Sequence, residues 1–366
     1  MLTISSKTNT AHIYAASIDV AADGFLRALC ASPAAENSRI RVMPDVHGGK
    51  GSVVGLTMTI TDRIIPGIVG VDISCGLLAV HFATKRIDFQ RLDKLIHERI
   101  PSGREIRTSP HRFADRIDLD RFQCARHIQA EKAALGIGTL GGGNHFIEID
   151  RAPDGSYWLL IHSGSRHLGV EVATHYQNLA HKACPGESYE MSWLAGELMQ
   201  AYLHDMVLAQ EYAEQNRQAM ADEIIRGMKW NALEQISTVH NYVDMDAMIL
   251  RKGAVSAKVG ERLVIPMNMR DGCLLCVGKG NAEWNESAPH GAGRLMSRTE
   301  AKQSFTLSQY KKAMAGVYSS SVSRETLDES PMAYKPMEAI VDAIGETAEV
   351  VDRWESVYNF KAEESE

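Results

Sequence analysis

Residues 40–83 decide how this chain folds, and they read IRVMPDVHGGKGSVVGLTMTITDRIIPGIVGVDISCGLLAVHFA. Short runs of β-branched and other apolar residues alternate with clusters of Gly, Pro and Asp, which is typical of strands joined by tight turns. Glycine allows positive φ angles and close approach of the backbone to a neighbouring group. Residues 135–168 return to the same pattern, beginning with LGIGTLGGGNHFIEID at 135–150. These glycine-rich stretches predict strands whose connecting turns converge on one site.

The intervening segments have a different character. Residues 84–134 are charged and mixed and predict helices and connections, whereas residues 190–235 contain good helix formers and no proline. Strands and loops resume over 236–298, and no period of 20 to 50 residues repeats. We therefore predict an α/β (α+β) fold in which residues 1–366 form a single compact domain of mixed sheets. A mainly helical insertion is expected at about 190–235, and a helical C-terminal tail at about 299–366.

Composition and charge exclude several classes of protein. The 366 residues are 45% apolar and 23% charged, as in ordinary soluble domains, and the six cysteines lack the spacing of a disulfide framework. Lys and Arg number 39 against 46 Asp and Glu, giving a net charge of −7 that excludes a basic coat but not a local phosphate-binding groove. Because the chain has neither a membrane-length apolar run nor a signal peptide pattern, we expect no membrane association and a cytoplasmic location.

Four familiar motifs are either incomplete or absent. The stretch CLLC at 273–276 has CxxC spacing but no second pair and no flanking histidines, so we interpret it as part of an apolar strand. The segment GCLLCVGKG has the wrong spacing for a phosphate-binding P-loop and lacks its Ser or Thr. Neither GxGxxG opening a helix nor GxSxG occurs, which gives dinucleotide binding and serine hydrolase chemistry little support.

Metal-type ligands recur in glycine-rich turns. A single histidine beside a strand is usually a hydrogen-bonded structural group, but here five segments share this composition. Carboxylate, thiolate and imidazole ligands supplied by separate loops suit Mn, Zn, Co or Fe. The sequence predicts a loop-built transition-metal site without naming its reaction, and its segments are Gly70–Gly76, Gly143–Glu148, His162–Arg166, His240–Asn241 and Pro289–Arg294.

The same segments resemble the RtcB family of RNA ligases. These enzymes join RNA 3′-phosphate or 2′,3′-cyclic phosphate ends to 5′-hydroxyl ends. The matching stretches occur in family order over roughly residues 42–298, with a weaker match reaching Lys361. They read MPDVHGGKGSVVG, GVDISCG, GGGNHFIEI, HSGSRHLG, HN, RKGA, IPMNMRDG and ESAPHGAGRLMSR.

The resemblance implies two bound Mn²⁺ ions and a covalent nucleotide intermediate. Cys75 would bridge the ions, with Asp72 and His145 completing one site and His162 and His240 the other. The family's nucleophile corresponds to His290, which would attack the α-phosphate of GTP, form a histidine–GMP adduct and release pyrophosphate. The guanylate would then activate the RNA 3′-phosphate as an RNA–pyrophosphate–guanosine end, in RNA repair or tRNA splicing.

Further residues are assigned through the same resemblance. Arg166, Arg251 and Lys252 would contact phosphates, whereas Asp45 and His47 would brace the metal site. The residues expected to bind GTP are Asn144, His145, Phe146, Ile147, Glu148, His240, Asn241, Pro266, Met267, Asn268, Met269, Cys273, His290, Gly291, Ala292, Gly293 and Lys361.

The chain also departs from the family pattern. The loop IPMNMRDG at 265–272 replaces the commoner IPGSMGT, Cys273 replaces a serine, and the usual run before the terminal lysine is missing. A metal-dependent RNA-end phosphodiesterase or phosphatase that has lost efficient joining is therefore an alternative, and a non-catalytic RNA-binding relative is a third. The substrate partner is RNA with these ends. The physiological RNA, the oligomeric state and the need for an activating or genomically coupled partner protein stay open.

Overall fold

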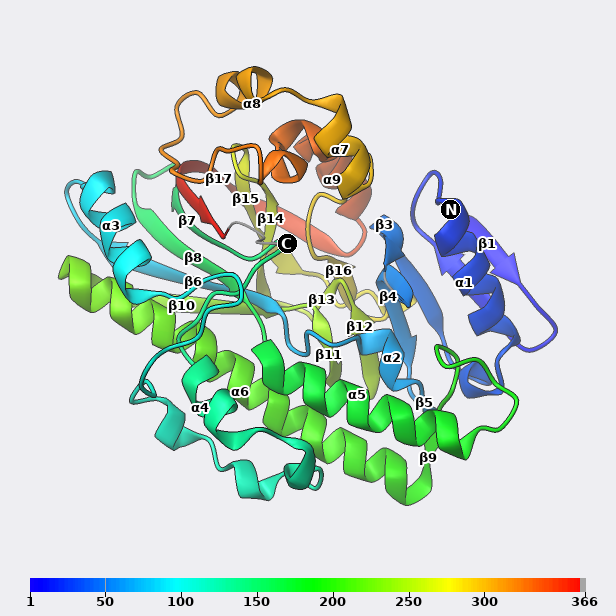
Figure 1. Ribbon diagram of the computed structural model, residues 1–366. Helices are drawn as coiled ribbons and strands as arrows, with labels where there is room; N and C mark the ends of the chain where they lie inside the picture. Colours follow the sequence, from blue (N-terminus) through cyan, green and yellow to red (C-terminus); the bar gives the residue numbers. More distant parts are fainter. Residues whose placement is uncertain (50, 363–366) are drawn as a thin grey trace.

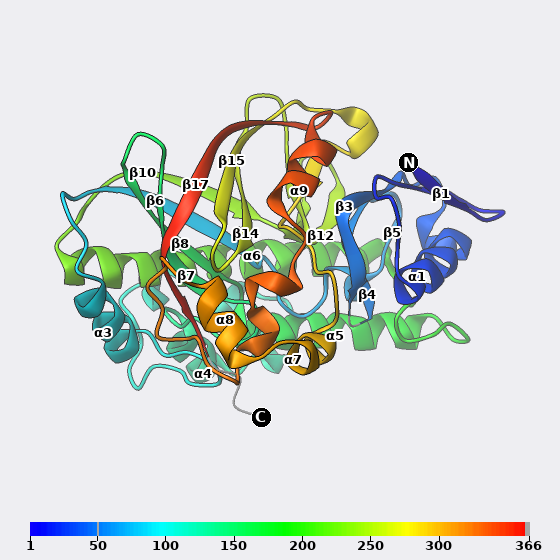
Figure 2. The same ribbon diagram turned by 90° about the horizontal axis from the view of Figure 1, so that it is seen from above.

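The computed structural model describes residues 1–49 and 51–362, and the described chain forms two large sheets supported by helices (Figures 1 and 2). The six-stranded sheet has the order β1-β2-β3-β4-β12-β11. All its neighbouring pairs are antiparallel except β2 and β3. Its strands are β1 (Leu2–Ser5), β2 (Thr10–Ile13), β3 (Ile40–Gly49), β4 (Ser52–Thr59), β11 (Asn241–Asp244) and β12 (Ile249–Lys252).

The seven-stranded sheet has the order β10-β6-β8-β7-β17-β15-β14 and is antiparallel throughout. Two small ribbons complete the strands that the structure describes, β5 (Arg63–Ile64) with β9 (Leu194–Ala195) and β13 (Ala254–Ser256) with β16 (Ser287–Pro289). The strands of the large sheet are β6 (Gly76–Ala83), β7 (Phe146–Arg151), β8 (Tyr157–Ser163), β10 (Asn231–Val239), β14 (Arg262–Asn268), β15 (Gly272–Gly278) and β17 (Ala348–Lys361).

Two long helices support both sheets from one side. Helix α5 lies along α6 at the bottom of Figure 1, and α6 contacts β8 of one sheet and β11 of the other. None of the helices in residues 1–49 and 51–362 combines the length and apolar character needed to cross a bilayer. The helices are α1 (Val20–Ala31), α2 (Pro66–Val69), α3 (Phe89–Arg99), α4 (Ala130–Gly136), α5 (Arg166–Ala183), α6 (Gly196–Met228), α7 (Arg298–Ser304), α8 (Leu307–Ala313) and α9 (Met337–Ile344).

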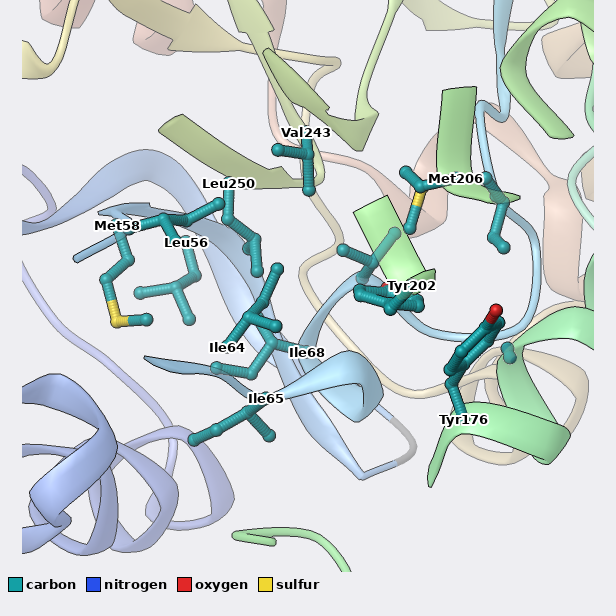
Figure 3. Close-up of a cluster of buried hydrophobic side chains, with 14 of the residues drawn as sticks. Leu56, Met58, Ile64, Ile65, Ile68, Tyr176, Tyr202, Met206, Val243 and Leu250 are labelled. Carbon is teal, nitrogen blue, oxygen red and sulfur yellow. The ribbon is translucent and has the colours of Figure 1, made fainter. Parts of the chain in front are cut away.

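The largest apolar core lies between the six-stranded sheet and the helices beneath it. Leu56 and Leu250 from the sheet meet Ile68 of α2, and Tyr176 and Tyr202 extend the cluster along α5 and α6 (Figure 3). Burial of such side chains contributes about 1.5–3 kcal/mol each. This core fixes α2 immediately before the turn that carries Asp72 and Cys75.

The prediction of a helical C-terminal tail is wrong over its last part. Helices α7, α8 and α9 are present, but residues 348–361 form strand β17 in the interior of the seven-stranded sheet, and residues 363–366 lie outside the described residues. Valine, tryptophan, tyrosine and phenylalanine favour a strand there. Because β17 hydrogen-bonds to β15 on one side and β7 on the other, long-range pairing decides its conformation.

The predicted fold class is confirmed, with differences in the helical regions. Helix α6 falls inside the segment predicted at 190–235, although β10 already begins at Asn231. Its face toward the sheets is buried, so it is a central part of the core. Helix α5 was not predicted, and it begins at Arg166, inside a stretch interpreted as strand and turn.

Candidate active site

The turn at residues 70–75 is tied to the junction between β10 and β11. The backbone amide of Ser74 donates to the Asn241 carbonyl at 2.6 Å, and the amide of His240 donates to the Cys75 carbonyl at 3.0 Å. Ser74 itself adopts a φ of 54°, an unusual value for a residue other than glycine. These bonds bring two segments far apart in sequence into one corner of the molecule.

Strand pairing places the remaining histidines beside the turn at residues 70–75. Strand β8 lies between β6 and β7, and its register places His162 opposite Leu77 on one side and Phe146 on the other. His145 immediately precedes β7. The structure therefore brings together Asp72, Cys75, His145, His162 and His240, the five residues that the sequence predicted as metal ligands.

The donor atoms of these five residues lie within contact distance. Cys75 Sγ is 3.4 Å from His145 Nε2 and 3.2 Å from His162 Nε2. Asp72 Oδ2 is 2.9 Å from His145 Nε2, and the Nε2 atoms of His162 and His240 are 3.3 Å apart. Two groups suitable for a metal ion share the Cys75 sulfur, one with Asp72 and His145 and the other with His162 and His240.

The hydrogen bonds around the histidines fit metal ligation. His145 Nδ1 lies 2.9 Å from the Leu140 carbonyl, and His162 Nδ1 lies 3.1 Å from the Asn144 carbonyl. Since a carbonyl can only accept, each Nδ1 carries the hydrogen and each Nε2 directs a lone pair at Cys75. Several lone pairs that point at one buried sulfur repel one another unless a cation lies between them. This donor set therefore fits two transition-metal ions.

Electrostatics keeps the imidazoles in their ligating form. Burial lowers the pKa of His162 and of His240 well below the ordinary value, so both rings are neutral near pH 7. Burial and the neighbouring Asp72 raise the pKa of the Cys75 thiol, a shift that a bound cation would reverse. The pKa of Asp72, which is only partly buried, is low because His145 lies beside it.

Helix α6 braces these loops with a polar pair that the sequence analysis missed. Asn216 accepts hydrogen bonds from the amides of Gly138 and Thr139 and donates to the Gly164 carbonyl at 3.0 Å. The fully buried Arg217 donates to the carbonyls of Ser74 at 2.6 Å and Ser163 at 2.9 Å. The only sequence signal was two adjacent polar residues that interrupt the buried face of a long helix.

Gly164 shows why this corner requires glycine. A Cβ atom built at Gly164 would lie 2.1 Å from Asp72 Oδ1, well inside contact distance. Any larger residue would displace the Asp72 carboxylate from His145.

His290 lies next to this cluster and is oriented by a buried carboxylate. His290 Nδ1 is 2.7 Å from Asp45 Oδ2, and the His290 amide donates to the same oxygen at 3.2 Å. Because a carboxylate only accepts, Nδ1 carries the hydrogen and Nε2 keeps its lone pair. The ring centroids of His290 and His240 are 4.7 Å apart. Asp45 was predicted to brace the metal ligands, but in the structure its carboxylate contacts His290 instead. The backbone carbonyl of Asp45 lies 2.9 Å from His47 Nδ1.

A cavity of about 960 Å³ opens beside His290 and is large enough for more than one nucleotide-sized group. It extends from the histidine cluster toward β14 and β17. The residues predicted to bind GTP that line this cavity are Asn144, Phe146, Glu148, His240, Pro266, Met267, Asn268, Met269, His290, Gly291, Ala292, Gly293 and Lys361.

Four residues predicted to bind GTP do not line this cavity. Ile147 packs in the apolar core on the other face of β7, because alternate residues of a strand point to opposite sides. Asn241 uses its side chain to bond the Asp72 carbonyl and the Gly253 amide. His145 belongs to the metal-type cluster, and Cys273 is fully buried beneath the cavity wall.

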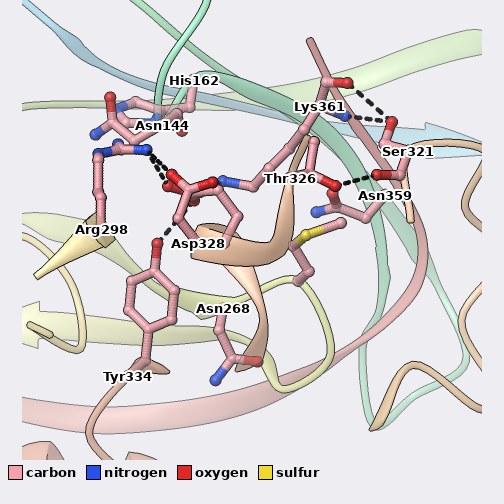
Figure 4. Close-up of polar contacts among 12 residues, drawn as sticks. Asn144, His162, Asn268, Arg298, Ser321, Thr326, Asp328, Tyr334, Asn359 and Lys361 are labelled. Carbon is pink, nitrogen blue, oxygen red and sulfur yellow. Dashed lines mark hydrogen bonds and ion pairs between the residues drawn. The ribbon is translucent and has the colours of Figure 1, made fainter. Parts of the chain in front are cut away.

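Lys361 ends β17 at the far wall of the cavity in a buried ionic network (Figure 4). Its Nζ pairs with Glu329, which also contacts Arg298 at 2.7 Å and accepts a hydrogen bond from the Tyr334 hydroxyl at 2.7 Å. Burial raises the pKa of Glu329, but Lys361 and Arg298 outweigh it and bring that pKa to about 2. The carboxylate is therefore charged and holds two cations at the cavity wall.

The predicted phosphate contacts do not line the cavity. Arg251 is fully buried and binds Asp244 and Ser287, so the prediction that it contacts phosphate is wrong. Lys252 and Arg166 are engaged by backbone carbonyls near the cluster, Lys252 by that of Val69 and Arg166 by that of Gly103. Besides Lys361, three cations line the cavity that were not predicted as phosphate contacts, Arg294, Arg298 and Lys335. Arg294 and Arg298 lie within the quoted stretch ESAPHGAGRLMSR, whereas Lys335 had no sequence signal.

Comparisons with known proteins give a matching family and several relatives. The profile of the family described as tRNA-splicing ligase RtcB matches residues 30–123 and 114–362. The chain is 32% identical to the RNA-splicing ligase RtcB of Escherichia coli (strain K12), over 85% of this chain and 87% of that protein. It is 28% identical to RNA-splicing ligase RtcB2 of Escherichia coli (strain ATCC 25922), over 84% and 83% of the two chains. It is 27% identical to the tRNA-splicing ligase RtcB of Aeropyrum pernix, over 85% of this chain and 84% of that protein.

Proposed function

The chain belongs to the RtcB family, and on this premise we propose that it is an RNA ligase that joins RNA 3′-phosphate or 2′,3′-cyclic phosphate ends to 5′-hydroxyl ends, using GTP and Mn²⁺. The single observation that carries the proposal is the position of His290. Its Nδ1 is held by Asp45, its ring lies against His240 of the metal-type cluster, and it faces a nucleotide-sized cavity.

His290 acts as the nucleophile in the first proposed step. Its Nε2 lone pair attacks the α-phosphorus of GTP, so that a phosphorus–nitrogen bond forms and pyrophosphate leaves. Asp45 keeps the Nδ1 hydrogen in place and stabilises the positive charge that develops on the ring. Two Mn²⁺ ions held by Asp72, Cys75, His145, His162 and His240 would supply charge neutralisation for the phosphates.

The walls of the cavity position the nucleotide and the RNA end. Gly291 and Gly293 leave room beside His290, and Lys361 and Glu148 offer polar groups to a purine base at the opposite wall. Arg294, Arg298 and Lys335 supply positive charge for RNA phosphates.

Two further transfers complete the proposed reaction. An oxygen of the RNA 3′-phosphate takes the guanylate from His290, which breaks the phosphorus–nitrogen bond and forms a pyrophosphate linkage. The 5′-hydroxyl oxygen then attacks the RNA phosphorus, and GMP leaves while the hydroxyl proton passes to water. A cyclic phosphate must first be hydrolysed to the 3′-phosphate.

Labelled GTP tests the first step. Incubation with Mn²⁺ and GTP labelled on the α-phosphate should leave radioactivity on the denatured protein, whereas GTP labelled on the γ-phosphate should leave none. Mass spectrometry should place the adduct on the peptide that contains His290. A protein that opens cyclic phosphates but never retains the α-label would instead be the phosphodiesterase alternative.

A further inference from the structure

Three potential ligands meet beneath the cavity wall, apart from the Cys75 cluster. Glu148 and Asp150 are two residues apart on β7 and therefore point to the same face of the sheet. Cys273 on β15 faces them, with its Sγ 3.9 Å from Glu148 Oε1. One donor atom from each residue lies within 4.8 Å of the others, and all three side chains are buried.

The charges of this group are not balanced by protein cations. Among the described residues, no ion pair involves Glu148 or Asp150, and the nearby Lys361 is paired with Glu329. Burial and the mutual proximity of the carboxyl groups raise the pKa of Glu148 well above its usual value, and burial raises that of Asp150 to about 6. Two buried carboxylates can both be charged only if a cation or a shared proton compensates them.

Oxygen atoms with no hydrogen-bond partner outside this group lie around it. They are buried and comprise both carboxylate oxygens of Asp150, Ser356 Oγ and Asn359 Oδ1, of which Asp150 is within hydrogen-bond reach only of Glu148 and Cys273, and Ser356 only of Glu148. The strand register places Ser356 of β17 opposite Asp150 and Asn359 opposite Glu148. The amide nitrogen of Asn359 already donates to Glu148, which leaves its oxygen free. Buried polar atoms nearly always have a partner, so this concentration of unpartnered oxygens indicates a missing ligand.

We propose that Glu148, Asp150 and Cys273 form a third metal site that takes a Zn²⁺ ion. One thiolate and two carboxylates are ligands that zinc accepts, and an oxygen of Ser356 or Asn359, or water, completes a tetrahedral set. Binding releases the thiol proton and the proton that the carboxyl groups share. Because Glu148 also lines the cavity, an ion can enter from there, and once bound it holds the Glu148 carboxylate in place.

The site uses only one cysteine of the CxxC stretch. Cys273 packs with Leu275 on one face of β15, and Cys276 packs with Leu274 on the other. The two cysteines thus point to opposite faces and cannot bind one ion together, which makes Cys276→Ser a matched control for Cys273→Ser.

Metal content of the full-length protein tests the proposal, and it needs neither RNA nor GTP. After equilibration with Zn²⁺ and removal of excess, Cys273→Ser and Asp150→Asn should each retain one Zn²⁺ ion per chain fewer than wild type, whereas Cys276→Ser should retain the full number. Cobalt substitution gives a second readout. The thiolate-to-cobalt absorption should weaken in Cys273→Ser and stay unchanged in Cys276→Ser.

A variant lacking the Cys75 cluster isolates the third site. Cys75→Ser/His240→Ala should still bind one Zn²⁺ ion per chain, and adding Asp150→Asn should remove it, with an affinity loss of at least about tenfold. Circular dichroism checks that these variants are folded. Equal zinc content in wild type, Cys273→Ser and Asp150→Asn would overturn the proposal and leave a carboxyl pair that shares a proton.

Discussion

His290→Ala should abolish formation of the protein–GMP adduct and reduce RNA joining by at least about a thousandfold, because alanine offers no nitrogen to attack GTP. The side chain is partly exposed at the cavity surface, so its loss should leave the fold and the bound metal almost unchanged. The measurement is the yield of α-labelled protein together with the rate of RNA joining.

His47→Ala is the matched control for this prediction. His47 lines the same cavity and contacts the same Asp45, but through the Asp45 carbonyl rather than its carboxylate. We expect this variant to retain adduct formation at a reduced rate. If His290→Ala formed the adduct at normal yield while His47→Ala did not, the nucleophile would be misassigned.

Cys75→Ser should lose most of the bound Mn²⁺, with an affinity reduced by at least about tenfold. The Cys75 sulfur belongs to both metal-type groups of the central cluster, so its replacement by the weaker hydroxyl ligand affects both ions at once. Manganese content per chain after dialysis measures this loss, and RNA joining should fall with it.

Cys276→Ser provides the comparison because Cys276 is equally buried but packs among apolar side chains of β15. It should keep the manganese content of wild type. A Cys75→Ser protein with as much manganese as Cys276→Ser would mean that the cluster does not hold the ions.

The local part of the site was predictable from sequence. Asp72 and Cys75 lie in a glycine-bounded turn, and His145 and His162 stand beside apolar strand segments, so residue type and position indicated a metal-type site in these segments, whereas the individual ligands were assigned through the family resemblance. The association of His290 with the cluster came from motif resemblance, and the structure places the two side by side.

Interactions between distant segments were not predictable in this way. Strand β17 is held between β15 and β7, two strands from elsewhere in the chain, and its own sequence does not reveal this pairing. Arg251 was assigned to phosphate through the stretch RKGA, yet it lies within β12 and is buried against Asp244 and Ser287. Arg217 and Lys335 donate hydrogen bonds to backbone carbonyls far away in the sequence, those of Ser74 and Pro44. Their neighbours in sequence therefore do not indicate these partners.

RNA joining with defined ends tests the central claim most directly. One RNA pair carries a 3′-phosphate and a 5′-hydroxyl, and the other carries a 3′-hydroxyl and a 5′-phosphate, each with Mn²⁺ and with or without GTP. The account predicts a joined product only from the first pair and only with GTP, because the second pair has no terminal 3′-phosphate to receive the guanylate. Joining of the second pair, or equal joining of the first pair without GTP by protein freed of bound guanylate, would contradict it.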